Sequence, residues 1–346
     1  MRPALPLWTI ALLAPLAVAQ PDPPAGPLHT SQTIPDIQTS VNMVPVTVSI
    51  TDQEGRPIPD IQADEVTVLD NGHPGEIQDF WRDVDTPLTI ALVVDLTNSQ
   101  RDFLDRHYRE LLQFLANVME SRDRAFLVTI WGDVSLVTDL TGSLQDLRLG
   151  VAELRANGST GDLFGKDHRG ARLGFLATPG RCGGSPIWNG VYSAARFRLQ
   201  DLPGRKAIVL LTDGYDTGSP RSLDETIEAA QSADAPVYAV FSGVEKTPLP
   251  PVLQATRRSP FPPHPREVGL PALVRLAVET GGGAYRATDE NAAATFQTIE
   301  EELRNLYVLG FVVPDEDRDG KFHKLEVKSS RAGVRIHARK GYTSLR

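Results

Sequence analysis

The sequence lacks most of the features that would assign the chain to an enzyme class or to a disulfide-stapled fold. Its 346 residues include a single cysteine, Cys182, so no intramolecular disulfide can form. It contains no G-x-S-x-G elbow, no P-loop and no H-E-x-x-H pair. The formal net charge of −9 argues against non-specific binding to nucleic acid or to anionic lipid. We therefore predict that the protein is not an enzyme and that it binds no nucleic acid.

Long apolar runs are absent except at the N-terminus. Leu5–Leu16 is apolar, and Ala17-Val18-Ala19 then fits the A-x-A cleavage site of a secretory signal peptide. The run is too short to be a spanning helix. We predict a signal peptide at residues 1–19, export to the periplasm or the extracellular space, and no membrane span after cleavage. Residues 20–35 are rich in proline, serine and threonine and are predicted to be a disordered linker.

Residues 36–85 carry the signals of a small N-terminal β-module. The segments 43–50, 65–70 and 77–81 have the composition and alternation of short strands, and Asn71-Gly72 is a strong hairpin signal between the last two. About 50 residues make a thin core, so the module is expected to pack against the rest of the chain.

Between residues 86 and 306 the pattern changes to alternating strands and helices. This alternation predicts a doubly wound, mostly parallel α/β sheet of Rossmann-like type, with helices on both faces. The predicted strands are 88–95, 125–131, 207–213, 236–241 and 284–287. The predicted helices are 100–121, 144–155, 187–200, 223–232, 272–280 and 292–306. Two stretches, 156–182 and 246–265, are interpreted as insertions.

Polar side chains cluster where two of the predicted strands end. Asp95, Thr97 and Ser99 follow one apolar strand, and Asp213 ends another. Ser185 stands at the start of a predicted helix between them. The carboxyl ends of strands in an open α/β sheet are where ligands bind, and hard oxygen donors suit a divalent cation. We expect these positions to lie on exposed loops, although an aspartate or serine there could also be an ordinary helix N-cap.

This constellation resembles the metal-ion-dependent adhesion site of von Willebrand factor type A domains, which reads Asp-x-Ser-x-Ser, then a threonine, then an aspartate. The resemblance makes Asp95, Thr97, Ser99, Ser185 and Asp213 the five positions. Thr97 replaces a serine and Ser185 replaces the threonine, and both keep the hydroxyl. By resemblance, the three hydroxyl residues would contact Mg²⁺, or Mn²⁺ or Ca²⁺, directly, and the two aspartates would act through water. A carboxylate of a protein partner would then bind the metal.

Residues 307–346 return to strands. The segment 307–313 is expected to pair with 322–327, and 334–338 comes after them. Residues 315–326 match the EF-hand pattern, but a strand ending in Pro314 enters them instead of a helix, so an acidic hairpin turn is predicted. Short links at both ends of residues 86–306 predict that 307–346 and 36–85 form one small β-sandwich-like domain. This arrangement resembles an exported bacterial group of type A-related proteins.

The sequence thus predicts an exported, metal-dependent protein-binding protein for adhesion or envelope assembly. Two alternatives stay open, a metal-using hydrolase and a scaffold whose site is vestigial and empty.

Overall fold

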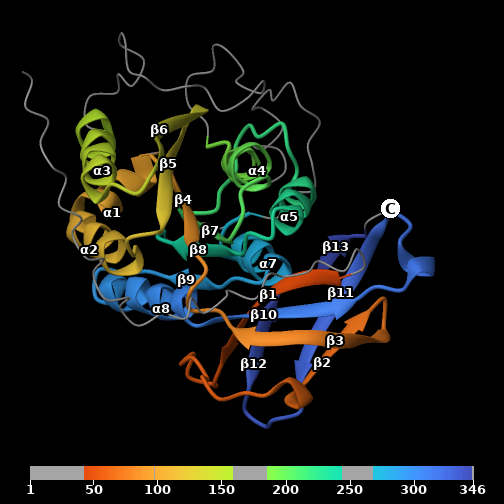
Figure 1. Ribbon diagram of the computed structural model, residues 1–346. Coiled ribbons are helices and arrows are strands. Elements are labelled where there is room, and N and C mark those ends of the chain that lie inside the picture. Colours follow the sequence, from red (N-terminus) through yellow and green to blue (C-terminus); the bar gives the residue numbers. More distant parts are fainter. Residues whose placement is uncertain (1–42, 97, 159–184, 244–267, 345–346) are drawn as a thin grey trace, which may run out of the picture. The chain divides into compact units, whose positions relative to one another are not determined.

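The structure is a computed structural model and contains two β-sheets, one of six strands and one of seven, together with the helices (Figure 1). It describes residues 43–96, 98–158, 185–243 and 268–344, without the side chains of 98, 99, 101 and 156–158. The predicted signal peptide, the linker at 20–35 and nearly all of the two insertions lie outside the described residues. Within the described residues, no helix is long and apolar enough to cross a membrane.

The six-stranded sheet has the strand order β6-β5-β4-β7-β8-β9. All neighbouring pairs are parallel except β5 and β6, which form an antiparallel pair. Every residue of β4 is buried, as expected for a central parallel strand that is covered on both faces. The strands are β4 (Leu88–Asp95), β5 (Arg124–Trp131), β6 (Asp133–Thr141), β7 (Arg205–Thr212), β8 (Val237–Phe241) and β9 (Ala284–Arg286).

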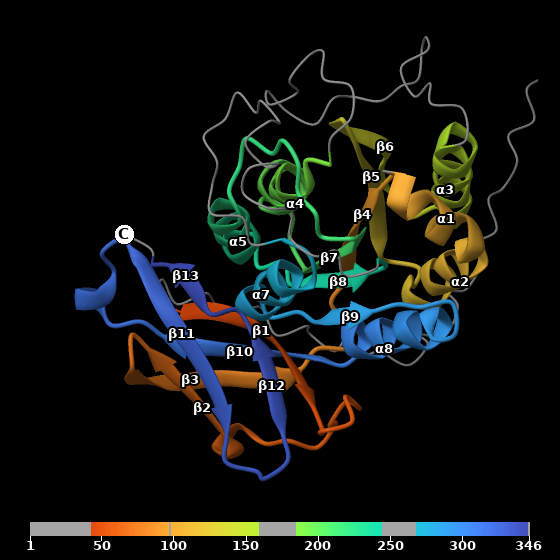
Figure 2. The same cartoon turned by 180° about the vertical axis from the view of Figure 1, so that it is seen from behind.

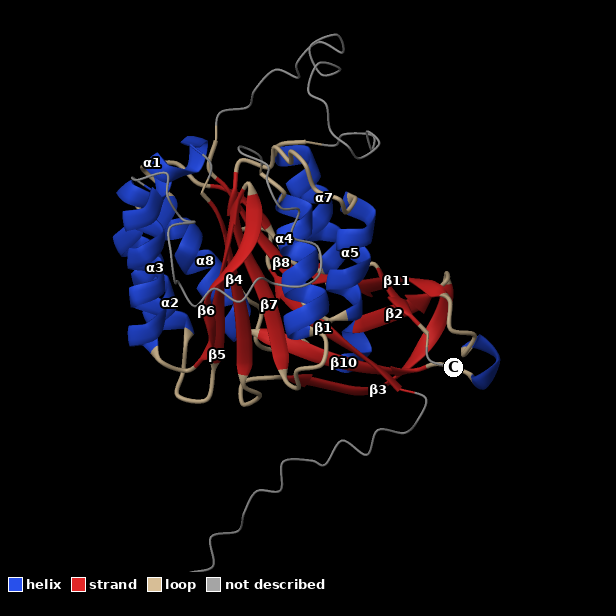
Figure 3. Cartoon of the chain, turned by 90° about the horizontal axis from the view of Figure 1, so that it is seen from above, coloured by secondary structure: helices blue, strands red, loops and turns tan. Residues whose placement is uncertain are grey.

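Helices cover both faces of this sheet (Figures 2 and 3). On one face, Ile90, Leu92 and Val94 pack with α1 (Asn98–Arg106), α2 (Tyr108–Val118), α3 (Leu144–Gly158) and α8 (Ala292–Arg304). On the other face, Ala91 and Val93 pack with α4 (Ile187–Ala194), the π-helix Ala195–Leu199, α5 (Leu223–Ser232) and α7 (Leu270–Thr280). The period-two alternation along β4 therefore divides the core into two layers.

The sequence predicted most of these elements but missed two features. The predicted helix 100–121 is two helices separated at His107, and the strand β6 was not predicted. The best local agreement is α5, because Ser222 accepts a hydrogen bond from the Glu225 amide and the Glu225 side chain bonds the Ser222 amide, a complete capping box.

The seven-stranded sheet is antiparallel and draws strands from both ends of the described chain. Its order is β12-β1-β10-β3-β2-β11-β13, so β10 lies between two N-terminal strands. The edge strands β12 and β13 are separated by only two residues, so the sheet curls around its own apolar core. The fold class predicted from the sequence is confirmed. The strands are β1 (Met43–Thr51), β2 (Val66–Asp70), β3 (His73–Arg82), β10 (Leu306–Val312), β11 (Phe322–Ser329), β12 (Arg335–Ala338) and β13 (Gly341–Thr343), with short 3₁₀ turns at Ala63–Glu65 and Asp315–Asp317.

The pairing predicted inside the C-terminal segment was wrong. The strand β10 pairs with β1 and β3, whereas β11 pairs with β2 and β13, so 313–321 is not a hairpin turn. Both edges of β10 are already occupied by N-terminal strands, which leaves no edge for β11. The hairpin predicted at Asn71-Gly72 is present, with φ values of 49° and 87° in the left-handed region.

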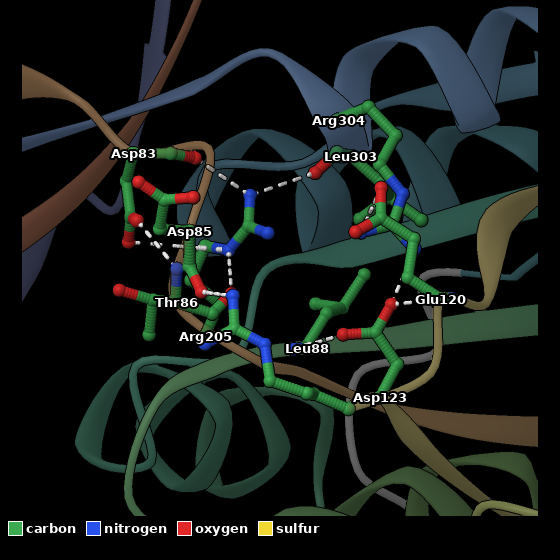
Figure 4. A network of polar contacts seen from close by, with 10 residues as sticks. Asp83, Asp85, Thr86, Leu88, Glu120, Asp123, Arg205, Leu303 and Arg304 are labelled. Carbon is green, nitrogen blue, oxygen red and sulfur yellow. Dashed lines mark hydrogen bonds and ion pairs between the residues drawn. The ribbon is translucent and has the colours of Figure 1, made fainter. Parts of the chain in front are cut away.

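Two buried arginines and a buried glutamate bond across the junction of the two sheets. Arg205, the first residue of β7, donates to the carbonyls of Thr86, Asp83 and Leu303 at 2.9, 2.8 and 3.3 Å (Figure 4). These carbonyls belong to the link from β3 to β4 and to the end of α8. The chain connects the two sheets twice, from β3 to β4 and from α8 to β10, and the Arg205 guanidinium bonds both connections.

The second arginine, Arg339, links α5 to β1. It donates to the Gln231 carbonyl at 3.0 Å, to the Asp234 carboxylate at 3.0 Å and to the Pro45 carbonyl at 2.7 Å. The glutamate, Glu302 of α8, accepts hydrogen bonds from Tyr285 and, at 3.4 Å, from Ser49 of β1. Burial raises the pKa of the Glu302 carboxyl above its usual value, against the opposing effect of those hydrogen bonds.

Candidate metal centre

Asp95 is the centre of a polar cluster at the carboxyl end of the six-stranded sheet. It is the last residue of β4, its exposed fraction is 0%, and its Oδ2 accepts hydrogen bonds from the Ser185 and Thr212 hydroxyls, both at 2.8 Å. Thr212 ends β7, the strand beside β4, so the parallel register places these two side chains next to each other. Ser185 reaches the same oxygen from the segment that precedes α4.

Asp213 lies one residue beyond Thr212 and is 3% exposed. Its Oδ1 accepts a hydrogen bond from the Tyr215 amide at 3.1 Å, which fixes the carboxylate at the turn after β7. Gly243, which comes after β8, packs against it so closely that an added Cβ would lie 2.9 Å from the Asp213 Cβ. The end of β8 therefore forms one wall of the site.

Gly214 occupies a position where the backbone conformation and the close approach of Gly269 require a glycine. Its φ is 72°, and an added Cβ would lie 2.7 Å from the Gly269 carbonyl oxygen. The Gly269 amide in turn donates to the Gly214 carbonyl at 2.8 Å. The start of α7 is therefore held against the turn that carries Asp213.

Buried polar contacts also join the first loop to the end of β8. Gln100, in the first turn of α1, donates from Nε2 to the Ser242 carbonyl at 2.7 Å and accepts from the Ser242 hydroxyl. Gln100 is 2% exposed and Ser242 is 5% exposed. The first turn of α1 is thereby attached to the segment that follows β8.

Three of the five positions predicted from the sequence, Asp95, Ser185 and Asp213, come together at this edge. Thr97 lies outside the described residues. Ser99 lies in the first turn of α1, and its side chain is not described. The expectation that the ligands sit on exposed loops was wrong for Asp95, Ser185 and Asp213, which are 0%, 4% and 3% exposed. Ser185 and Thr212 bond Asp95, and Gly243 packs against Asp213.

Two residues that matter for the geometry were missed by the sequence pattern. Thr212 bonds Asp95 and also accepts from the Gly214 amide at 3.1 Å. Asp216 accepts from the Trp188 amide at 3.1 Å and from the Ser219 hydroxyl. Burial raises the pKa of the Asp216 carboxyl to about 6, although these hydrogen bonds favour the charged form. The sequence feature that could have pointed to Thr212 and Asp216 is their position close to Asp213 in the chain.

The donor set fits a small hard cation. Buried carboxylates are costly unless they are paired or coordinate a metal, and here two of them stand at the ends of adjacent strands beside serine and threonine hydroxyls. Among the described residues, no group of three His, Cys, Asp or Glu side chains could hold a metal. A cation here would depend on hydroxyl oxygens as well as on Asp95 and Asp213.

No protein-family model and no curated protein sequence matches the chain. Similar solved structures include proximal thread matrix protein 1 from the mussel byssus, at 12% identity and a TM-score of 0.43, over 74% of this chain and 50% of that chain. BatB from Bacteroides thetaiotaomicron matches at 15% identity and a TM-score of 0.43, over 63% of this chain and 100% of its own. The vWF domain of the type V pili tip protein Mfa5 from Porphyromonas gingivalis matches at 12% and 0.40, over 63% and 95%.

The strand order β6-β5-β4-β7-β8-β9, with helices on both faces, agrees with the mostly parallel, doubly wound sheet predicted from the sequence. The six-stranded sheet with its helices is called the type A-like domain below, after the resemblance noted in its sequence. The chain spans only half the length of the mussel protein that it matches.

Proposed function

We propose that the protein is an exported, metal-dependent protein-binding protein that acts in adhesion or in assembly of the cell envelope. The observation that carries the proposal is the cluster at the carboxyl end of the parallel sheet. There, Asp95 Oδ2 accepts hydrogen bonds from Ser185 and Thr212, and Asp213 is the next residue after Thr212. Ligands of open α/β sheets bind at this edge. In this proposal Asp95, Ser185 and Asp213, with Thr97 and Ser99 from the sequence motif, hold Mg²⁺, or Mn²⁺ or Ca²⁺.

A bound cation would supply a positive centre that attracts a carboxylate of the partner protein. The hydroxyl ligands add no charge, so they leave the cation with more affinity for an incoming anion than carboxylates in the same places would. The chain's own residues set the geometry: Asp95 orients the Ser185 hydroxyl at 2.8 Å, and the Tyr215 amide orients Asp213. The proposed surface for the partner is therefore the edge formed by the ends of β4 and β7.

Isothermal titration with Mg²⁺, Mn²⁺ and Ca²⁺ tests the proposal. We expect the unsubstituted protein to bind at least one of these ions and Asp95→Ala to abolish binding. Because Asp95 is fully buried, Asp95→Asn is the better-matched variant, since its amide oxygen can still accept the two hydroxyl hydrogen bonds. Equal binding by Asp95→Asn and the unsubstituted protein would contradict the assignment.

Two further measurements separate the alternatives. Capture of a partner from envelope extract in Mg²⁺, with loss of that partner on addition of chelator and in Asp95→Asn, supports metal-dependent binding. Hydrolysis that a chelator abolishes would favour the metal-using hydrolase. A protein that binds none of the three ions would be the scaffold with a vestigial site.

A further inference from the structure

Helix α4 begins directly after Ser185 and Pro186, and its first amides are satisfied from another part of the chain. Its N-cap residue, Pro186, makes no side-chain capping hydrogen bond. The Trp188 amide donates instead to Asp216 Oδ1, and the Asn189 amide donates to Ser219 Oγ, both at 3.1 Å. Residues 216–219, which lie between β7 and α5, therefore cap α4 from a distance.

The same segment holds Ser185 itself. The Ser185 amide donates to Thr217 Oγ1 at 2.7 Å, and the Thr217 amide donates to the Ser185 carbonyl at 2.8 Å. The Ser219 hydroxyl also donates to Asp216, so the residues that cap α4 are bonded to each other. Hydrogen bonds from three residues of the segment 216–219 thus hold residues 185–189 in place.

The energetic reason for these contacts is the burial of the start of α4. Ser185, Trp188 and Asn189 are 4%, 5% and 3% exposed, so water cannot replace a lost partner of their amides without an opening of the structure. The carboxylate of Asp216 at the helix N-terminus also interacts favourably with the helix dipole. The position of Ser185 is therefore set from the segment beyond Asp213.

We propose that Asp216, with Thr217 and Ser219, is the positioning residue of the candidate metal centre, which holds Ser185 in hydrogen-bonding distance of Asp95. This inference rests on the proposed function for its consequence in metal binding. Asp216 touches neither Asp95 nor the cation in this scheme. It joins the loop of Asp213 to the loop of Ser185, so that two of the three segments of the motif move as one unit.

Three variants test the role. Asp216→Ala removes the acceptor of the Trp188 amide, whereas Asp216→Asn keeps an oxygen in the same place. Ser222→Ala is the matched control, because it also removes a helix cap. The Ser222 hydroxyl caps α5 by accepting from the Glu225 amide, and Ser222 lies three residues beyond the segment 216–219. Each variant is measured by hydrogen exchange of the Trp188 and Asn189 amides, by Mg²⁺ titration and by thermal unfolding.

We expect Asp216→Ala to speed exchange at Trp188 and Asn189 and to weaken Mg²⁺ binding about 10- to 100-fold, the usual cost of losing a residue that orients a ligand. Asp216→Asn should restore both. Ser222→Ala should lower the melting temperature without changing either readout. Unchanged exchange at Trp188 in Asp216→Ala overturns the positioning role whether or not ions bind, whereas a protein that binds no ion refutes the proposed function separately. An Asp216→Asn variant as impaired as Asp216→Ala would also overturn it.

Discussion

Substitution of Arg205 by methionine tests how the two sheets are joined. The Arg205 side chain is 3% exposed, donates to three backbone carbonyls and lies 3.9 Å from the Asp83 carboxylate (Figure 4). Burial lowers the pKa of the guanidinium, and Asp83 opposes that effect. The carbonyls and the carboxylate around the guanidinium therefore offset the cost of burying its charge.

The expected loss comes from the acceptors that the substitution leaves behind. Methionine fills much of the arginine volume but supplies no donor, so the carbonyls of Asp83, Thr86 and Leu303 lose their partner. Removal of one member of a buried, hydrogen-bonded ion pair costs about 3–5 kcal/mol, and part of that is recovered because the guanidinium no longer has to be desolvated. We expect the free energy of unfolding to fall by about 3 kcal/mol, which corresponds to a drop of about 5 °C in melting temperature for a chain of this size.

Urea and thermal unfolding of Arg205→Met, with Arg221→Met as the control, measure the effect. Arg221 pairs with Glu225 at 2.7 Å, but its side chain is 30% exposed, and exposed pairs contribute about 0.2–1 kcal/mol. Hydrogen exchange should report early opening at residues 83–87, the link between β3 and β4. If both variants lose the same stability, or if residues 83–87 keep their protection, Arg205 does not hold the junction.

The other predictions concern the buried carboxyl at the junction, the shared sheet and the wall of the site. Because burial raises the folded-state pKa of Glu302, its contribution to stability is fully present below its ordinary value of 4.5 and is lost as the pH rises through the folded-state pKa. Glu302→Gln should therefore match the unsubstituted protein at pH 4 and exceed it in urea midpoint at pH 8, and parallel curves over that range would contradict the argument. Truncation after Leu306 removes nearly all of β10 and the three strands beyond it, so limited proteolysis should cut within residues 36–85 and spare the type A-like core; resistance of residues 36–85 would mean that they fold without those strands. Gly243→Ala places a Cβ 2.9 Å from the Asp213 Cβ, so calorimetry should show weaker Mg²⁺ binding, and unchanged affinity would show that Asp213 can shift without cost.

The sequence by itself determined the alternation of strands and helices in the type A-like domain. Strands with an unbroken apolar run at their centre, such as β4 and β7, depend on residues close together in the chain, and so does a local capping box such as that of α5. For the same reason the motif could be located, since Asp95 and Asp213 each lie at the end of their own strand. That the terminal segments share one domain could be inferred from the short links at both ends of residues 86–306.

Only the tertiary structure decided which strands pair and which residues complete the site. The strand β10 inserts between β1 and β3, more than two hundred residues away in sequence, because an antiparallel pair requires matched edges and not neighbouring positions in the chain. Thr212 bonds Asp95 across 117 residues, and Asp216 caps α4 across 28. The surroundings of the buried Asp95 likewise come from distant parts of the chain, because Ser185 bonds its carboxylate across 90 residues.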